Sequence, residues 1–188
     1  MGNFYTNFTL RGVSPQAVAE SLKGRKSVVT PLVNQTVVVF DKASDHQDDK
    51  IISTLATKLS RILHCPVWAV LNHDDSIFWY QLFSDGKLED EYDSSPGYFD
   101  SHAMPSAPKG GDARKLCSAF GSPSIAEVER ILRKSSFEED GYVFAFERHA
   151  DLVKALSISE FGVGTSFANI ESNYLPEGLS PDDIIRTK

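Results

Sequence analysis

The stretch from 67 to 92, VWAVLNHDDSIFWYQLFSDGKLEDEY, constrains the fold of this chain more than any other segment. Runs of apolar and aromatic residues, separated by polar turns, predict short strands at 67–71, 77–83 and 88–92. An Asp-Gly pair separates the last two strands, and glycine adopts the positive φ that a tight hairpin turn needs. We therefore expect an antiparallel meander of three strands.

The later two strands of this meander differ in the faces that they present. In 77–83, apolar side chains occupy both alternating sets of positions, which predicts a strand that is covered on both sides. In 88–92, two glutamates alternate with Leu88 and Tyr92, which predicts one dry face and one wet face. We expect this last strand to lie at or near a sheet edge.

The segment before the meander has its own regular pattern. Alternating apolar residues predict a strand at 3–11, and β-branched runs at 26–33 and 36–41 predict a hairpin. Ser14-Pro15 opens a first helix, and an apolar stripe after an acidic start predicts a second helix over 51–62. The order strand, helix, strand, strand, helix, strand is the βαββαβ arrangement of a ferredoxin-like fold. We therefore expect an α+β protein with a ferredoxin-like antiparallel sheet that carries extra strands.

The composition changes after the meander. Residues 94–111, SSPGYFDSHAMPSAPKGG, are rich in serine, proline and glycine and predict a loop or linker. Capping residues and apolar stripes then predict helices at 112–120, 122–134 and 142–158, although 142–146 could equally form a strand. The expected division is an α+β sheet region at 1–93 and an α-rich region at 112–188 that packs on it.

Negative charge is concentrated around the last strand of the meander. The chain has 19 lysines and arginines against 26 aspartates and glutamates, a net charge of −7. The window 74–100 alone holds eight acidic residues and one lysine, so its own net charge is also −7. Because phosphate binding needs clustered positive charge, this composition argues against nucleic-acid and anionic-membrane partners.

The remaining composition indicates a cytoplasmic protein. The sequence contains no apolar run long enough to cross a bilayer and no secretory signal pattern. Cys65 and Cys117 lie in apolar surroundings without the spacing of a redox or metal motif. We expect both to be buried thiols in a reducing compartment.

The common catalytic motifs are missing from the sequence. It has no Walker A loop, dinucleotide-binding glycine motif, nucleophile elbow, HExxH motif or calcium-binding loop. The histidines are scattered singly, without a partner at metal-ligand spacing. We therefore expect no cofactor and no metal, and we favour a protein that is not an enzyme. His73-Asp74-Asp75 offers an imidazole beside carboxylates for acid-base chemistry, with a polar turn as the alternative.

Two groups of residues are candidates for a binding surface. Acidic and aromatic residues follow one another at the end of the meander, an arrangement that suits a basic partner. The alternative is a charged edge strand that prevents aggregation. An Arg-His pair in the third C-terminal helix could bind an anion or pair with the acidic edge, or lie on a solvated helix face. The candidates are Glu89, Glu91, Tyr92, Asp93, Tyr98 and Phe99 in the first group, and Arg148 and His149 in the second.

Two longer stretches carry a resemblance. RHADLVKALSISEFGVGTSFANIESNYLPEGL at 148–179 and AVLNHDDSIFWYQLFSDGKLEDEYDSSPGYF at 69–99 resemble a family of uncharacterised bacterial proteins. The resemblance implies a bacterial, cytoplasmic protein and assigns neither an activity nor a functional residue.

The sequence thus leads to two hypotheses about function. The first is a non-catalytic interaction protein whose acidic edge engages a basic protein, in the manner of an immunity or inhibitor protein. The second is an enzyme or small-ligand-binding protein with a pocket between the sheet and the C-terminal helices, near the loop 98–108. A flat acidic face would favour the first hypothesis, and a deep pocket with converging carboxylates or histidines would favour the second.

Overall fold

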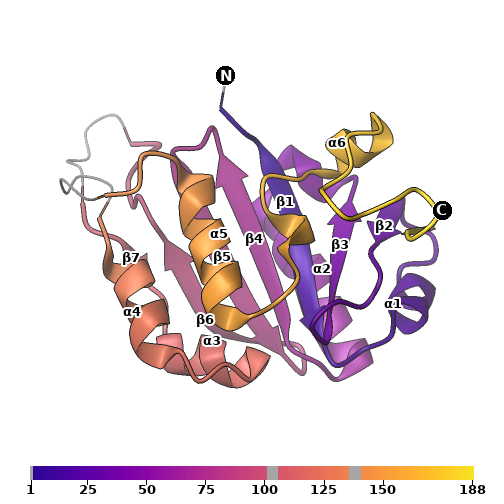
Figure 1. Ribbon diagram of the computed structural model, residues 1–188, viewed down its shortest axis with the longest axis horizontal. Coiled ribbons are helices and arrows are strands. Elements are labelled where there is room, and N and C mark those ends of the chain that lie inside the picture. Colours follow the sequence, from indigo (N-terminus) through magenta and orange to yellow (C-terminus); the bar gives the residue numbers. More distant parts are fainter. Residues whose placement is uncertain (1, 101–105, 136–140) are drawn as a thin grey trace.

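The computed structural model describes residues 2–100, 106–135 and 141–188, and within them eight antiparallel strands form one sheet (Figure 1). The strand order is β7-β6-β5-β4-β1-β3-β2-β8, and helices cover the sheet. The predicted α+β class is therefore confirmed. The strands are β1 (Tyr5–Arg11), β2 (Ser27–Val29), β3 (Thr36–Asp41), β4 (Val67–His73), β5 (Ile77–Ser84), β6 (Lys87–Asp93), β7 (Lys109–Gly110) and β8 (Ile185–Arg186).

Helices lie on both faces of the sheet, and Figure 1 is viewed from the side of α5, with α2 behind the strands. On the far face, α1 and α2 pack on β1, β3 and β4. On the near face, α3, α4 and α5 pack on β4, β5 and β6. The α-helices are α1 (Pro15–Ser21), α2 (Asp49–Leu63), α3 (Ala113–Phe120), α4 (Ile125–Arg133), α5 (Ala145–Leu156) and α6 (Phe167–Glu171), and two 3-10 turns are η1 (Ser44–His46) and η2 (Glu160–Gly162).

The strands β4 and β5 form the centre of the predicted meander. They pair over their whole length, from Val67 opposite Phe83 to His73 opposite Ile77. Trp68 and Tyr80 are completely buried under the near helices, whereas Phe83 is buried under α2. The middle strand is therefore covered on both sides at Phe83, whereas Trp79 on the α2 face is only partly buried.

The last strand of the meander departs from strict alternation. The pairing of β5 with β6 shifts register between Leu82 and Phe83, which places Leu88 opposite Phe83. Leu88 is therefore 47% exposed and does not share the buried position of Tyr92, contrary to the expected dry face.

Local interactions determine where the long helix α2 begins and ends. Asp48 accepts hydrogen bonds from the backbone N–H groups of Lys50 and Ile51, so its side chain caps the first turn. His64 ends the helix in the left-handed conformation, and Pro66 follows. Ile52, Leu55 and Leu59 share the buried face of the helix, so one apolar stripe is enough to fix α2 on the sheet.

The segment predicted as a linker and the C-terminal tail both contribute to the sheet. Lys109–Gly110 pairs with Asp93 and Tyr92 as β7. Gly110 is required there, because its φ is +75° and a Cβ atom would lie 2.2 Å from the Glu91 carbonyl oxygen. Ile185–Arg186 pairs with β2 as β8, so the C-terminal region is not purely helical. Residues 101–105 of the predicted linker lie outside the described residues.

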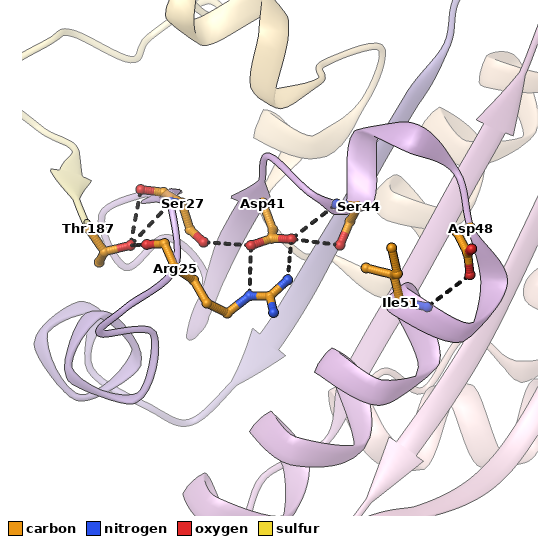
Figure 2. A network of polar contacts seen from close by, with 7 residues as sticks. All are labelled: Arg25, Ser27, Asp41, Ser44, Asp48, Ile51 and Thr187. Atoms are coloured by element: carbon orange, nitrogen blue, oxygen red, sulfur yellow. Dashed lines mark hydrogen bonds and ion pairs between the residues drawn. The ribbon is translucent and has the colours of Figure 1, made fainter.

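A buried carboxylate ties the C-terminal tail to the sheet (Figure 2). Asp41, only 1% exposed, accepts hydrogen bonds from Arg25 at 2.7 and 3.0 Å and from the Ser27 hydroxyl at 2.8 Å. The backbone N–H and hydroxyl of Ser44 donate to the same carboxylate at 3.1 and 2.9 Å. Thr187 in turn donates from its hydroxyl to the Arg25 carbonyl at 2.7 Å, which connects this network to β8.

The pKa of Asp41 reflects this environment. Burial alone raises the pKa, but the hydrogen bonds from Arg25, Ser27 and Ser44 and the charge of Arg25 together hold it below its ordinary value. Asp41 is therefore a buried anion that its donors keep charged.

Within the part of the chain that the structure describes, no helix has the length and apolar character to span a bilayer.

Candidate functional site

A cavity of about 510 Å³ opens on the α2 face of the sheet, where β4 ends and β5 begins. We call it the acidic-aromatic cavity. Its size lies within the range of small-ligand pockets. It is lined by Gln47, Asp49, Leu71, Ile77, Trp79, Asp93, Ser95, Gly97, Tyr98, Phe99 and Asp100.

The floor of the acidic-aromatic cavity is a row of side chains across three strands. Leu71 on β4 pairs with Trp79 on β5, which pairs with Asp93 on β6, so all three side chains point to the α2 face. Because α2 begins only at Asp49, its apolar stripe stops short of this end of the sheet. Leu71 and Trp79 are consequently only partly buried and form an apolar floor.

The outer wall is the segment that follows β6. It is held to β5, because the backbone N–H of Ser94 donates to the Phe78 carbonyl and the Ser94 hydroxyl accepts from the Phe78 N–H. The Tyr98 N–H then donates to the Ser95 carbonyl and closes a turn. The rings of Tyr98 and Phe99 contact each other at 5.2 Å, and they are 47% and 76% exposed. Two aromatic rings thus stand at the cavity in contact with solvent.

A histidine supports the wall from behind. Gln47 donates its amide N–H to the Asn72 carbonyl at 2.8 Å, so its amide oxygen faces His73 Nδ1, 2.6 Å away. The neutral His73 ring must therefore carry its proton on Nδ1. Its ring also contacts Phe99 at 5.1 Å and Phe4 at 4.8 Å. His73 thus positions Gln47 and Phe99.

The proposed partnership of His73 with its neighbouring aspartates is not formed. Asp74 accepts the backbone N–H of Gly2 at 3.1 Å, and Asp75 accepts that of Asn3 at 2.9 Å. These carboxylates fix the start of the chain on the β4–β5 turn, which agrees with the polar-turn alternative.

Negative charge in the acidic-aromatic cavity comes from three separate segments. Asp49 lies in the first turn of α2, Asp93 ends β6, and Asp100 lies in the segment after it. Burial raises the pKa of Asp93, although the hydrogen bond from the Ser95 N–H and the charge of Lys109 oppose the shift. The described lining residues include no lysine or arginine.

The structure brings together only part of the predicted acidic surface. Asp93, Tyr98 and Phe99 line the cavity, as described above. Glu91 is exposed on β6 opposite Gln81, outside the cavity lining. Glu89 lines a different groove, beside Lys115, whose Nζ donates to the Glu89 carbonyl at 2.6 Å.

Three of the predicted residues are buried in the core instead. Tyr92 is 1% exposed and donates from its hydroxyl to the Leu132 carbonyl at 2.9 Å. Arg148 is completely buried, donates to the Lys134 carbonyl at 2.6 Å and lies 4.5 Å from the centre of the Tyr142 ring. An accessible binding site and its alternative, a solvated helix face, both need exposed side chains at Arg148 and His149, whereas α5 turns both side chains toward the sheet and the end of α4.

Sequence reasoning missed several residues of the acidic-aromatic cavity. The alternation of β5 correctly groups Ile77 with Trp79, but it gives no sign that Trp79 is only partly buried and that both residues line a cavity. Asp49 looked like an ordinary acidic residue at a helix start. Only the packing of α2 against the sheet places it in the lining of the same cavity as Asp93.

No protein-family model, curated protein or solved structure matches this chain.

Proposed function

We propose that this protein is a non-catalytic binding protein and that its acidic-aromatic cavity receives a positively charged group of a basic partner. One observation carries the proposal: carboxylates from three segments share a cavity with the rings of Trp79, Tyr98 and Phe99. Asp93 is partly buried, and a carboxylate in a partly desolvated place attracts a cation more strongly than an exposed carboxylate does. The faces of aromatic rings attract the same kind of group.

The second hypothesis places a pocket between the sheet and the C-terminal helices, whereas this cavity lies on the opposite, α2 face of the sheet. The chemistry of its lining supports a non-catalytic role. Among the described lining residues there is no histidine, cysteine or lysine to serve as a nucleophile or a base near neutral pH. His73 lies behind the wall, with its Nδ1 engaged by Gln47. The exposed rings of Tyr98 and Phe99 instead suit a surface that a partner covers.

A short oligolysine peptide tests this proposal. We expect the wild-type protein to bind the peptide and Asp93→Asn to weaken binding roughly tenfold, because one charge-assisted hydrogen bond is lost while the shape is kept. Isothermal titration calorimetry gives the dissociation constants. The control is Glu20→Gln. It removes the charge of an exposed acid that pairs with Lys23 and does not belong to the cavity lining. Equal affinities for wild type and Asp93→Asn would contradict the proposal.

The same binding should weaken as the pH falls. Because burial raises the pKa of Asp93, this carboxylate takes up its proton at a higher pH than an exposed aspartate does. Peptide affinity should therefore begin to fall in mildly acidic solution, and Asp93→Asn should flatten that part of the curve. Titrations at several pH values with both proteins check this prediction, and parallel curves would refute it.

The exposed edge of β6 supports a second candidate site. Glu89 and Glu91 are exposed there beside Leu88, so acidic and apolar groups are accessible together. This arrangement suits an immunity or inhibitor protein that engages a basic protein through its edge. Changing Glu89 and Glu91 to lysine should abolish peptide binding if this edge is the site. If the acidic-aromatic cavity is the site, Asp93→Asn should have the larger effect.

We also propose that residues 5–73 form a ferredoxin-like unit. Its support is the strand order β4-β1-β3-β2, with α1 and α2 on the same face. The strands β5, β6 and β7 then extend one side of the sheet, and β8 extends the other.

A further inference from the structure

The carboxylates of the acidic-aromatic cavity are distributed around it. Asp49 belongs to the helix side, Asp93 to the sheet, and Asp100 to the outer segment. Among the described residues, no three acidic, histidine or cysteine side chains are close enough together to hold a metal ion. Asp49 and Asp93 lie on different elements of the lining, so a ligand that pairs with both carries a positive charge for each of them.

Apolar surface lies next to the charge. In the row across the sheet, Leu71 and Trp79 come before Asp93, and neighbouring strands are about 4.8 Å apart. A ligand that reaches Asp93 along this row thus passes roughly 10 Å of apolar floor, two strand spacings. Methylene groups gain free energy on such a floor, whereas a hydrated ion does not.

The aromatic wall adds a third requirement. Tyr98 and Phe99 present exposed rings beside Asp100. Ammonium groups lie favourably over such rings, and the attraction is larger where water is partly excluded. The ligand that complements the carboxylates, the apolar floor and the aromatic wall together is a flexible chain with ammonium groups at intervals along it.

We infer that the acidic-aromatic cavity binds an aliphatic polyamine, with ammonium groups at Asp93 and Asp49 and methylene groups on Leu71 and Trp79. This inference rests on the proposed function, because it names the class of cation that the cavity selects. A polyamine fits better than a simple metal cation, since its charges are spaced and its linkers are apolar.

The test compares amines of increasing charge by isothermal titration calorimetry with the full chain. The probes are butylamine, 1,4-diaminobutane and spermidine, with magnesium chloride as the inorganic cation. We expect each additional ammonium group to tighten binding roughly tenfold, which corresponds to one charge-assisted hydrogen bond. Magnesium should neither bind with comparable affinity nor displace spermidine at equal concentration.

Substitutions of the cavity residues show where spermidine binds. Asp93→Asn and Asp49→Asn should each weaken spermidine binding roughly tenfold, and Trp79→Ala should weaken it without changing its dependence on salt. Glu20→Gln has the same loss of charge outside the cavity and should bind spermidine like the wild type. Circular dichroism of every variant checks that the fold is retained.

The outcomes separate the inference from the proposed function. Equal affinity for butylamine and spermidine, or an equal effect of Glu20→Gln and Asp93→Asn, would overturn the polyamine assignment. If oligolysine binds in an Asp93-dependent way and no amine does, the inference fails and the proposed function stands. If neither the amines nor the peptide binds, both fail.

Discussion

Replacing His149 with phenylalanine should make the protein more resistant to acid. His149 is completely buried, and burial lowers its pKa to about 3. Its Nδ1 lies 2.9 Å from the Tyr5 hydroxyl, while its Nε2 is among the buried polar atoms of the described residues without a hydrogen-bond partner. The ring packs at 5.2 Å from Phe78 and 5.4 Å from Trp68. A proton added to the ring would create a buried charge whose Nε2–H group has no acceptor among the described residues.

The direction of the effect follows from proton linkage. The unfolded chain binds a proton at His149 below about pH 6.5, whereas the folded chain does so only near pH 3. Folding stability therefore falls as the pH decreases through this window, by about 1.4 kcal/mol per pH unit. Between about pH 6.5 and pH 4.5 the wild type should lose roughly 3 kcal/mol more than His149→Phe.

Urea unfolding at several pH values measures this difference. At neutral pH the variant should be less stable by about 1 kcal/mol, because the Tyr5 hydroxyl loses its partner. The control is His64→Phe, since His64 is exposed and paired with Asp85 at the surface. The explanation would be wrong if His149→Phe and the wild type lost stability in parallel.

Asp41→Ala should destabilise the protein by about 3 kcal/mol, at the lower end of the cost of breaking a buried ion pair because Arg25 keeps some contact with water. The substitution leaves the Ser27 and Ser44 hydroxyls and the Ser44 backbone N–H without their acceptor. Because Thr187 is joined to the backbone of Arg25 and Ser27, β8 should loosen as well.

Two measurements check the role of Asp41. Urea unfolding gives the change in stability, and hydrogen exchange at the Thr187 amide, which donates to the Ser27 carbonyl, reports the release of β8. Glu20→Ala removes an exposed pair with Lys23 and should change stability by less than about 0.5 kcal/mol. A similarly small effect of Asp41→Ala would contradict the assigned role.

The charge of Asp41 also predicts a pH dependence of its own. The folded-state pKa lies below the ordinary value, so the stabilisation is complete above about pH 4 and is lost as the pH falls through the folded pKa. Asp41→Asn should lack this loss. It occurs at lower pH than the effect of His149, so the two can be separated.

Local patterns were sufficient for most elements of the fold. The alternation in 77–83 and the Asp-Gly turn predicted β5 and its hairpin, and the stripe after Asp48 predicted α2. These features depend on side-chain periodicity and capping, which act within a few residues. The edge strands β7 and β8 were missed because each is two residues long and exists only through its partner strand.

The candidate site was predictable only in part. Asp93, Tyr98 and Phe99 were identified because acidic and aromatic residues are close together in the sequence there. Tyr92, Arg148 and His149 were misplaced, because α3, α4 and α5 cover that face of β5 and β6, and nothing local indicates that cover. The unusual burial of Arg148 is compatible with the fold because carbonyls at the end of α4 accept its N–H groups.

The sequence by itself determined that this chain forms an α+β protein with an aromatic-rich meander and a concentration of acid at its end. The tertiary structure alone decided which of the acidic residues share a cavity. It left Trp79 on β5 only partly buried and brought Asp49 and Asp93, far apart in the chain, to one cavity. The physical reason is that periodicity fixes which face of an element is apolar, whereas the total burial over the whole molecule decides which part of that face stays open.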